Sequence, residues 1–205
     1  MAISETVLIL ASGTAVVSIL FGIRLAMRAA GGAAKAPQSD GGEAAAAGGS
    51  GAADVAGVIA LPPLIFFRFL VAATVLEAIL PLRFLAAHAL ARYLAGAALA
   101  AGGFVMIGMG TQRFVAAGTN IAPYLPTTAL VVEGIYGRTR NPLYLGTTLV
   151  YLGLGVAAGS LWAIVLVVPL LWVINVGVVA REERYLERKF GDSYRAYKAR
   201  VRRWV

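Results

Sequence analysis

The 205-residue sequence contains no cysteine and a single histidine, and only 14% of its residues are charged. Without cysteine the chain can form no disulfide, thiolate zinc site or cysteine nucleophile, and His88 alone cannot form a multi-histidine metal site. Soluble domains carry about 25% charged and 45–50% apolar residues. Here 60% of the residues are hydrophobic and the mean hydropathy is +0.79. These values predict an integral membrane protein without a metal site.

Several apolar stretches approach the roughly 20 residues that cross a bilayer. They lie at residues 3–23, 55–82, 90–111, 144–157 and 161–180. We therefore expect an all-α polytopic membrane protein with about five transmembrane helices. The Ala158-Gly159-Ser160 break predicts a tight C-terminal helical hairpin, whose first arm is short for a full crossing. Arg68 and Glu77, inside the second stretch, either line a substrate tunnel or reach toward opposite interfaces.

Composition divides the chain into three parts. Residues 1–29 predict an N-terminal transmembrane helix, because the positive charges follow the apolar run instead of preceding it as in a signal peptide. Residues 30–54 are nearly all Gly, Ala, Ser and isolated charges, which predicts a flexible linker, or one that docks on the body. Residues 55–205 form the predicted membrane-embedded core. Its last part, Glu182 to Trp204, is predicted to be an amphipathic tail on the cytoplasmic surface.

Basic residues predict the orientation. Of the 18 Lys and Arg, 15 lie in residues 24–54, 112–143 and 181–205, and nine of these are in the last segment. Only Arg83 and Arg92 fall in the predicted outer loop. The positive-inside rule then places the N-terminus outside and the C-terminus in the cytoplasm. The net charge is +8. We expect the basic C-terminal tail to bind anionic lipid headgroups and not nucleic acid.

One connection departs from membrane-helix composition. It contains the run Glu133-Gly134-Ile135-Tyr136-Gly137-Arg138-Thr139-Arg140-Asn141-Pro142-Leu143-Tyr144-Leu145-Gly146. Pro142 disfavours a helical Asn141 but can itself begin a helix. The free N–H groups at that start, with Arg138 and Arg140 beside them, favour a carboxylate or phosphate. The alternative is a capped helix whose arginines anchor to lipid headgroups.

The hairpin would return Glu182 and Glu183 to the membrane face that carries Arg140. A solvated charged face is the usual explanation for such a run. Two carboxylates opposite an anion-binding helix start would also hold a zwitterionic ligand by both ends.

The pattern Gly-x-Tyr-x-x-x-Arg-Asn-Pro-x-Tyr-x-Gly, a hydrophobic hairpin, and then Glu-Glu-x-x-Leu-x-x-x-Phe-Gly-x-x-Tyr-x-x-Tyr resembles a known superfamily of membrane enzymes. These are the isoprenylcysteine carboxyl methyltransferases and phospholipid methyltransferases, and the resemblance covers about residues 104–204. It implies a cytoplasmic-side pocket for S-adenosyl-L-methionine (SAM), with S-adenosyl-L-homocysteine as product. The implied cofactor-binding residues are Gly108, Gly110, Tyr136, Arg140, Asn141, Pro142, Tyr144, Gly146, Glu182 and Glu183. The Gly108-Met109-Gly110 triplet would equally serve close helix packing.

The acceptor stays open at this stage. An amine must lose a proton, for which Glu183 or Glu133 would be the base, whereas a carboxylate acceptor needs a cation such as Arg140. Carboxyl methyltransferases of the superfamily usually have His where this chain has Asn141. With a composition that looks bacterial, this favours a phosphatidylethanolamine-like phospholipid amine at the bacterial inner membrane. The alternatives are carboxyl methylation of a prenylated or lipophilic carboxylate, and a non-enzymatic membrane scaffold that binds no SAM.

Overall fold

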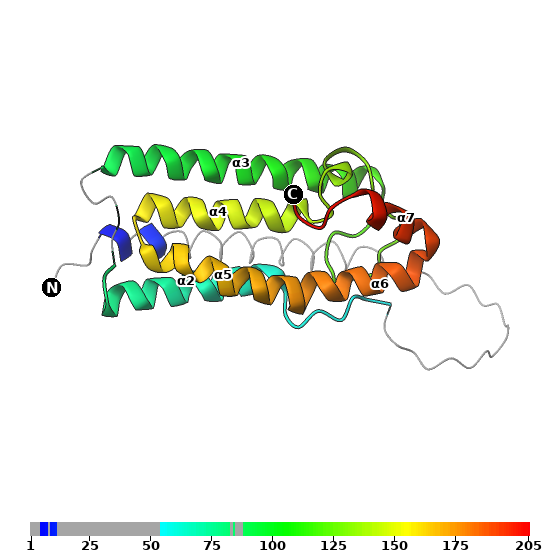
Figure 1. Cartoon of the computed structure of the whole chain (residues 1–205), viewed down its shortest axis with the longest axis horizontal. Helices are drawn as coiled ribbons and strands as arrows, with labels where there is room; N and C mark the ends of the chain where they lie inside the picture. The colour runs from blue at the N-terminus through cyan, green and yellow to red at the C-terminus, as the bar shows by residue number, and fades with distance from the viewer. Residues whose placement is uncertain (1–4, 8, 12–53, 83, 85–87) are drawn as a thin grey trace, which may run out of the picture.

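The computed structural model describes residues 5–7, 9–11, 54–82, 84 and 88–205. Every regular element within these ranges is a helix, and the longer helices run along one common direction (Figure 1). The prediction of an all-α fold is confirmed. Most of the predicted first span and of the 30–54 linker lies outside the described residues.

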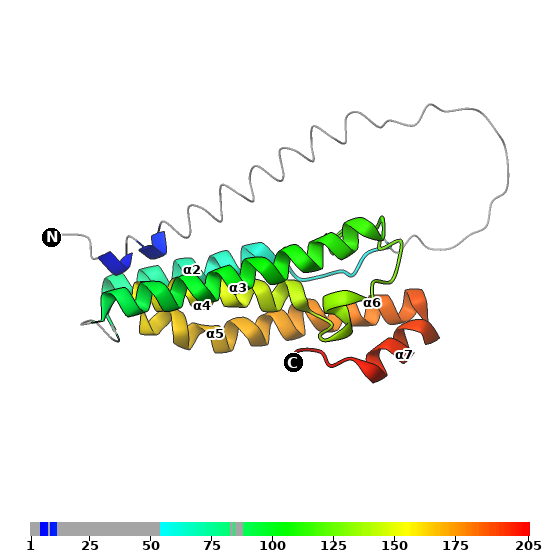
Figure 2. The same cartoon turned by 90° about the horizontal axis from the view of Figure 1, so that it is seen from above.

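Within the described residues, four long helices alternate in direction through the bundle (Figures 1 and 2). They are α2 (Pro62–Ile79), α3 (Ala89–Ala116), α4 (Pro142–Ala158) and α5 (Leu161–Ile174). The shorter elements are the 3-10 helix η1 (Gly134–Gly137), the π-helix η2 (Asn175–Val179), α6 (Ala180–Phe190) and α7 (Asp192–Arg200). The end that holds the α4–α5 turn is called the hairpin end. The opposite end, which gathers η1, α6 and α7, is called the site end.

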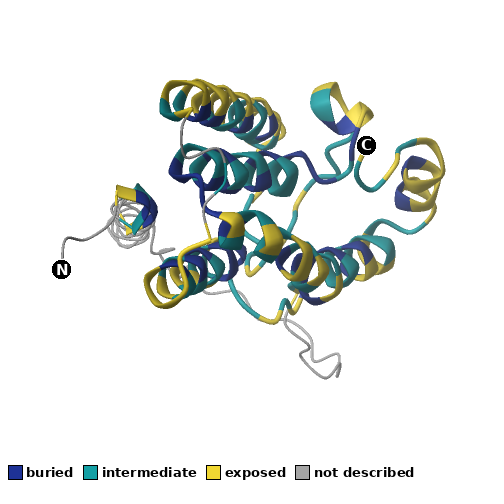
Figure 3. Cartoon of the chain, turned by 60° about the vertical axis from the view of Figure 1, so that its left-hand side comes forward, coloured by how far each residue is buried: buried dark blue, intermediate teal, exposed yellow. Residues whose placement is uncertain are grey.

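Helix length and surface composition mark a membrane protein. Three described helices are long and apolar enough to cross a bilayer, namely Pro62–Ile79, Ala89–Ala116 and the continuous Leu161–Phe190, while Pro142–Ala158 is shorter. Large apolar side chains such as Leu90, Val168 and Trp172 point outward, and exposed residues cover the outer faces of the helices (Figure 3). Such faces suit lipid, since the backbone polar groups are satisfied within each helix. The chain is an all-α polytopic membrane protein.

The α4–α5 hairpin forms at the predicted break. Gly159 has φ of 66°, a left-handed conformation that glycine adopts without strain and that ends α4. Ser160 then caps α5 by accepting a hydrogen bond from the Ala163 N–H at 3.4 Å. A helix end and a helix start thus fit into three residues.

Glu77 and Arg92, both among the described residues, are buried at the hairpin end. Ser160 Oγ donates to Glu77 Oε2 at 2.8 Å, and Arg92 Nη1 donates to the Ala158 carbonyl oxygen at 3.1 Å. Arg92 therefore lies within α3 and not in the outer loop where the sequence had placed it. Arg68 is exposed on α2. Neither Arg68 nor Glu77 lines the cavity at the site end described below.

Two element boundaries differ from the prediction. The second helix begins at Pro62 and not near Val55, because a proline is best accommodated in the first turn of a helix. The last helix does not end near residue 180, where the predicted apolar stretch ends: α6 continues α5 through η2, and the chain turns at Gly191, which has φ of 54°. After this turn α7 folds back toward the start of α4 (Figure 1).

Helices α3 and α4 touch along their backbones. A Cβ atom added to Gly103 would lie 2.4 Å from the Gly146 carbonyl oxygen, and one added to Gly96 would lie 2.5 Å from that of Gly153. These spaces admit no side chain, so the four glycines permit the contact, as small residues do between membrane helices. We call this contact the glycine seam. It fixes the position of α4, and hence of the turn that precedes it.

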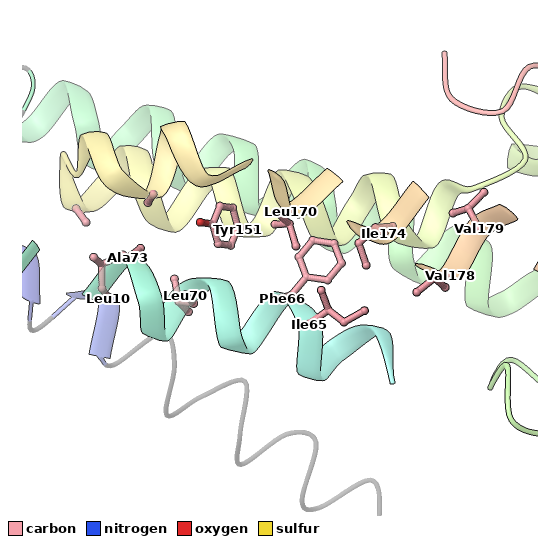
Figure 4. Close-up of a cluster of buried hydrophobic side chains, with 12 residues drawn as sticks. Leu10, Ile65, Phe66, Leu70, Ala73, Tyr151, Leu170, Ile174, Val178 and Val179 are labelled. Carbon is pink, nitrogen blue, oxygen red and sulfur yellow. The ribbon is translucent and has the colours of Figure 1, made fainter. Parts of the chain in front are cut away.

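An apolar core joins α2 to the long helix α5–η2–α6. Phe66 and Leu70 of α2 pack with Leu170 and Ile174 of α5 and with Val178 of η2 (Figure 4). Lipid tails are as apolar as these side chains, so close packing holds the helices together here more than the exclusion of water does. The core anchors the long helix up to the point where it reaches the site end.

The glycine seam predicts opposite outcomes for two neighbouring glycines. We expect Gly103→Ala to lower the free energy of unfolding by about 1–3 kcal/mol, because the new methyl group meets backbone atoms of α4. We expect Gly102→Ala to leave stability unchanged or to raise it, because an added Cβ there meets nothing within 4 Å and alanine favours the helix. Thermal unfolding of the detergent-solubilised variants measures both, and equal midpoints would contradict the seam.

Candidate active site

A cavity of about 520 Å³, including its open mouth, lies at the site end. It is lined by the end of α3, the connection that follows it, η1, the start of α4, and helices α6 and α7. The lining residues are Phe114, Thr127, Ala129, Leu130, Val131, Tyr136, Arg140, Asn141, Glu182, Glu183, Leu186, Tyr194 and Tyr197.

The turn before α4 sets one wall. Asn141 is non-helical (φ −127°), as expected before a proline, and α4 begins at Pro142. The Arg140 side chain turns inward, and its Nη1 donates to the carbonyl oxygens of Lys198 at 2.9 Å and Val201 at 3.1 Å. Among the described residues no group accepts a hydrogen bond from its buried Nε. One donor of this guanidinium is therefore available to a bound ligand.

Glu183 joins two arginines into an ion cluster. Its Oε1 accepts from Arg140 Nη2 at 2.8 Å and from Arg203 Nε at 3.1 Å, and its Oε2 accepts from Arg203 Nη2 at 2.5 Å. The carboxylate side chain is only 8% exposed. Two guanidinium groups and one carboxylate leave a net charge of +1, which favours an anionic group nearby. We call these three residues the Arg–Glu–Arg cluster.

Glu182 has a different environment although it is the adjacent residue. It accepts a hydrogen bond from the Tyr144 hydroxyl at 2.6 Å. Successive helical residues point about 100° apart, so Glu182 faces α4 while Glu183 faces the two arginines. Glu182 also borders a second, smaller cavity, which shares Phe114, Thr127 and Leu186 with the first. It is the carboxylate that stands between the two spaces.

Aromatic side chains close the cavity on the side of α7. The Tyr197 hydroxyl donates to the Tyr136 carbonyl oxygen at 2.8 Å, and the Tyr194 and Tyr197 rings meet edge to face at 6.0 Å. Burial raises the pKa of Tyr136 and Tyr194, and it raises the pKa of Tyr197 to about 12. All three phenols therefore stay neutral near pH 7 and form uncharged walls suited to a planar ring.

The structure brings part of the predicted site together. Tyr136, Arg140, Asn141, Glu182 and Glu183 line the cavity. Of the other predicted residues, Tyr144 contacts the cavity through Glu182 and Pro142 begins α4.

The predicted glycines and Glu133 lie elsewhere. Gly146 belongs to the glycine seam, and a Cβ added to Gly110 would sit 3.4 Å from the Tyr136 hydroxyl. A Cβ added to Gly108 would meet nothing within 4 Å. Glu133 is exposed and outside the lining, so its place offers no support for the predicted role as a base.

Sequence reasoning missed Arg203. It lies in a run of basic residues that read as a lipid-binding tail, and nothing in its local sequence distinguishes it from Arg202. The sequence also did not indicate that the connection at residues 117–133 forms a wall of the cavity. It has no helical or strand periodicity, so its path depends on contacts such as the bond from the Thr127 N–H to the Tyr185 hydroxyl at 3.1 Å.

The family model of phospholipid methyltransferases matches residues 91–193, half of the chain. The chain belongs to this family. A Haemophilus influenzae protein described as uncharacterized is 46% identical over 63 residues, which is 31% of this chain and all of that protein. The protein-S-isoprenylcysteine O-methyltransferase of Schizosaccharomyces pombe is 36% identical over 72 residues, 35% of this chain but only 30% of that enzyme. No solved structure matches the chain significantly.

The family and the fold agree with the predicted superfamily. The matched region contains α4, α5, α6 and nearly all of α3, and thus most walls of the cavity. These matches support a membrane methyltransferase. They leave its acceptor undetermined.

The Arg–Glu–Arg cluster predicts a large effect of one carboxylate on stability. We expect Glu183→Ala to lower the free energy of unfolding by about 3 kcal/mol, because two guanidinium groups lose their shared partner in a mostly buried site. The control is Glu187→Ala, on the same helix, which loses a more exposed pair with Lys198 at 3.2 Å and should cost about 1 kcal/mol or less. Titration with a denaturing detergent measures both losses. A smaller loss for Glu183→Ala than for Glu187→Ala would refute a supporting role for the cluster.

Proposed function

We propose that this protein transfers a methyl group from SAM to a lipophilic acceptor at the membrane face, namely a phosphatidylethanolamine-like phospholipid amine. One observation carries the proposal: the family-matched region supplies most of a cavity that Arg140 and Glu183 of the cationic cluster and a separate carboxylate, Glu182, all line.

The cavity residues suit the chemistry of SAM. Its amino acid end carries a carboxylate and an ammonium group, and its other end is an adenine ring. The free Nε of Arg140 and the net positive Arg–Glu–Arg cluster fit the carboxylate, and Glu182 fits a cation or ribose hydroxyl groups. Phe114 and Tyr194 are aromatic lining residues of the kind that accompany a planar ring. Charge and aromatic walls therefore fit this cofactor.

When bound, SAM supplies a methyl group that its sulfonium already activates, so the protein needs no nucleophile of its own. The residues of the chain hold the two reactants in line in a site that apolar walls such as Leu130 and Leu186 shield from water. Such alignment can account for about 7–11 kcal/mol of a barrier.

Glu182 is better placed than Glu183 to act as a base. Glu183 is held by two arginines, which stabilise its charged form and occupy both oxygens. Glu182 receives one hydrogen bond, from Tyr144, among the described residues and lies between the two cavities. It could accept the proton that an ammonium headgroup must lose before its nitrogen attacks.

The second cavity favours an amine over a carboxylate. Its lining residues are Ala56, Phe114, Asn120, Ile121, Ala122, Pro123, Thr127, Glu182, Tyr185 and Leu186, with no Lys or Arg among them. A carboxylate acceptor would need a positioning cation there, whereas an ammonium group is attracted to Glu182. Carboxyl methylation of a prenylated or lipophilic carboxylate remains the second candidate, because of the match to the Schizosaccharomyces pombe enzyme.

The site end would face the cytoplasm of a bacterial inner membrane. Most Lys and Arg of the described chain lie at this end, where the positive-inside rule and anionic headgroups place them. Arg184 and Arg188 of α6 are exposed and available to anionic lipid. This orientation puts both cavities at the depth of phospholipid headgroups.

Calorimetric titration of the purified protein with SAM and with S-adenosyl-L-homocysteine tests the cofactor. We expect binding by the wild type and at least tenfold weaker binding by Glu182→Gln, since one charge-assisted hydrogen bond contributes about 1.5–3 kcal/mol. The control is Glu133→Gln, which removes an exposed carboxylate outside the cavity and is expected to bind as the wild type does. If the wild type shows no heat of binding at millimolar SAM, the methyltransferase proposal is wrong and the non-enzymatic scaffold is the remaining alternative.

Incubating membranes with methyl-labelled SAM tests the acceptor. We expect the label in the phospholipid fraction, where it stays in a non-volatile headgroup fragment after alkaline treatment. Volatile labelled methanol released by alkali would instead show a methyl ester and establish carboxyl methylation. Membranes that contain the Glu182→Gln variant provide the background.

A further inference from the structure

The C-terminal tail, defined as residues 201–205, folds back onto the turn before α4. The Arg140 N–H donates to the Arg202 carbonyl oxygen at 3.0 Å. The Asn141 side-chain amide and the Thr139 hydroxyl both donate to the Arg203 carbonyl oxygen, at 2.8 and 3.2 Å. The C-terminus accordingly lies beside the start of α4 (Figure 1). None of this tail falls in the region that the family model matches, which ends at residue 193.

The Arg203 side chain connects the tail to the long helix at two points. Its Nη1 donates to Asn175 Oδ1 at 3.1 Å, and its Nη2 donates to Glu183 Oε2 at 2.5 Å. Asn175 begins the π-helix η2, and Glu183 lies in α6.

The π-helix explains how one arginine reaches both residues. In a regular α-helix, residues 175 and 183 would point about 80° apart after eight steps of 100°. A π turn takes up one extra residue, which reduces this difference to about 20° by the same geometry. Asn175 and Glu183 therefore share one face of the long helix, and Arg203 lies across that face.

We propose that Arg203 is a positioning residue for the cofactor site. Held by Asn175, it fixes Glu183 from one side, and Glu183 in turn fixes the guanidinium of Arg140, a lining residue of the cavity whose buried Nε has no partner among the described residues. The tail thereby completes a site that the family-matched region does not complete alone. This inference rests on the proposed function, since Arg140 is the group expected to meet the carboxylate of SAM.

Arg202 offers a matched control. It is the preceding residue and carries the same charge, but its side chain is exposed, and only its backbone carbonyl contacts Arg140. Alanine at either position removes one positive charge from the tail. An effect of general charge on lipid or cofactor would be equal for the two variants, whereas positioning of Glu183 is specific to Arg203.

The first experiment measures SAM affinity by calorimetry and the KM for SAM by methyl transfer. We expect Arg203→Ala to raise the dissociation constant and the KM for SAM about tenfold with a smaller change in kcat. Arg203→Lys should recover part of the lost affinity, and Arg202→Ala should stay within about twofold of the wild type. Asn175→Ala, which leaves the ion cluster intact, should raise the dissociation constant by a smaller factor. Equal effects of Arg203→Ala and Arg202→Ala would overturn the proposal.

The second experiment needs no cofactor. Amide hydrogen exchange of the peptide covering residues 196–205 is followed in the full-length protein. We expect faster exchange in Arg203→Ala and Asn175→Ala but not in Arg202→Ala, and unchanged exchange in Arg203→Ala would refute the tail contact. If the wild type bound no SAM while exchange still rose in Arg203→Ala, the proposed function would fail and the positioning of the tail by Arg203 would stand.

Discussion

The site end depends on the carboxylate of Glu183. Three segments far apart in the sequence meet there: the turn before α4 through Arg140, the long helix through Glu183 itself, and the tail through Arg203. A carboxylate with little exposure tolerates such a position only when its oxygens are fully bonded, and here each oxygen faces a guanidinium. This meeting point holds together the cavity walls formed by the turn before α4 and by α6.

The adjacent residues Glu182 and Glu183 have different partners because of helix geometry. Because they point to different sides of α6, Glu183 is paired with arginines, whereas Glu182 accepts a hydrogen bond from Tyr144 and lies beside the cavity. Treating the two as one motif hides this difference. A substitution that changes both at once would mix a loss of folding with a loss of ligand contact, so single substitutions are needed to separate them.

The features that local chemistry determines were predictable from sequence. The Ala158-Gly159-Ser160 break predicted the hairpin, Pro142 predicted the start of α4, and the hairpin brought the Glu-Glu pair back to Arg140. The features that depend on distant contacts were not. Nine basic residues follow residue 180, and only the folded chain selects Arg203 among them. The sequence of Asn175–Val179 likewise contains no local signal for a π turn. For the glycine seam, the sequence shows only glycines seven residues apart, and this spacing does not identify which helix packs against them.

The glycine seam limits the paths by which a lipid can reach the site end. Along it the carbonyl oxygens of α4 lie where side chains of α3 would otherwise stand, so no hydrocarbon chain can slip between these two helices. A lipid that reaches the site end must arrive around the seam and not through it. The seam thus closes the α3–α4 side of the protein to lipid. A lipophilic molecule would enter from one of the other sides.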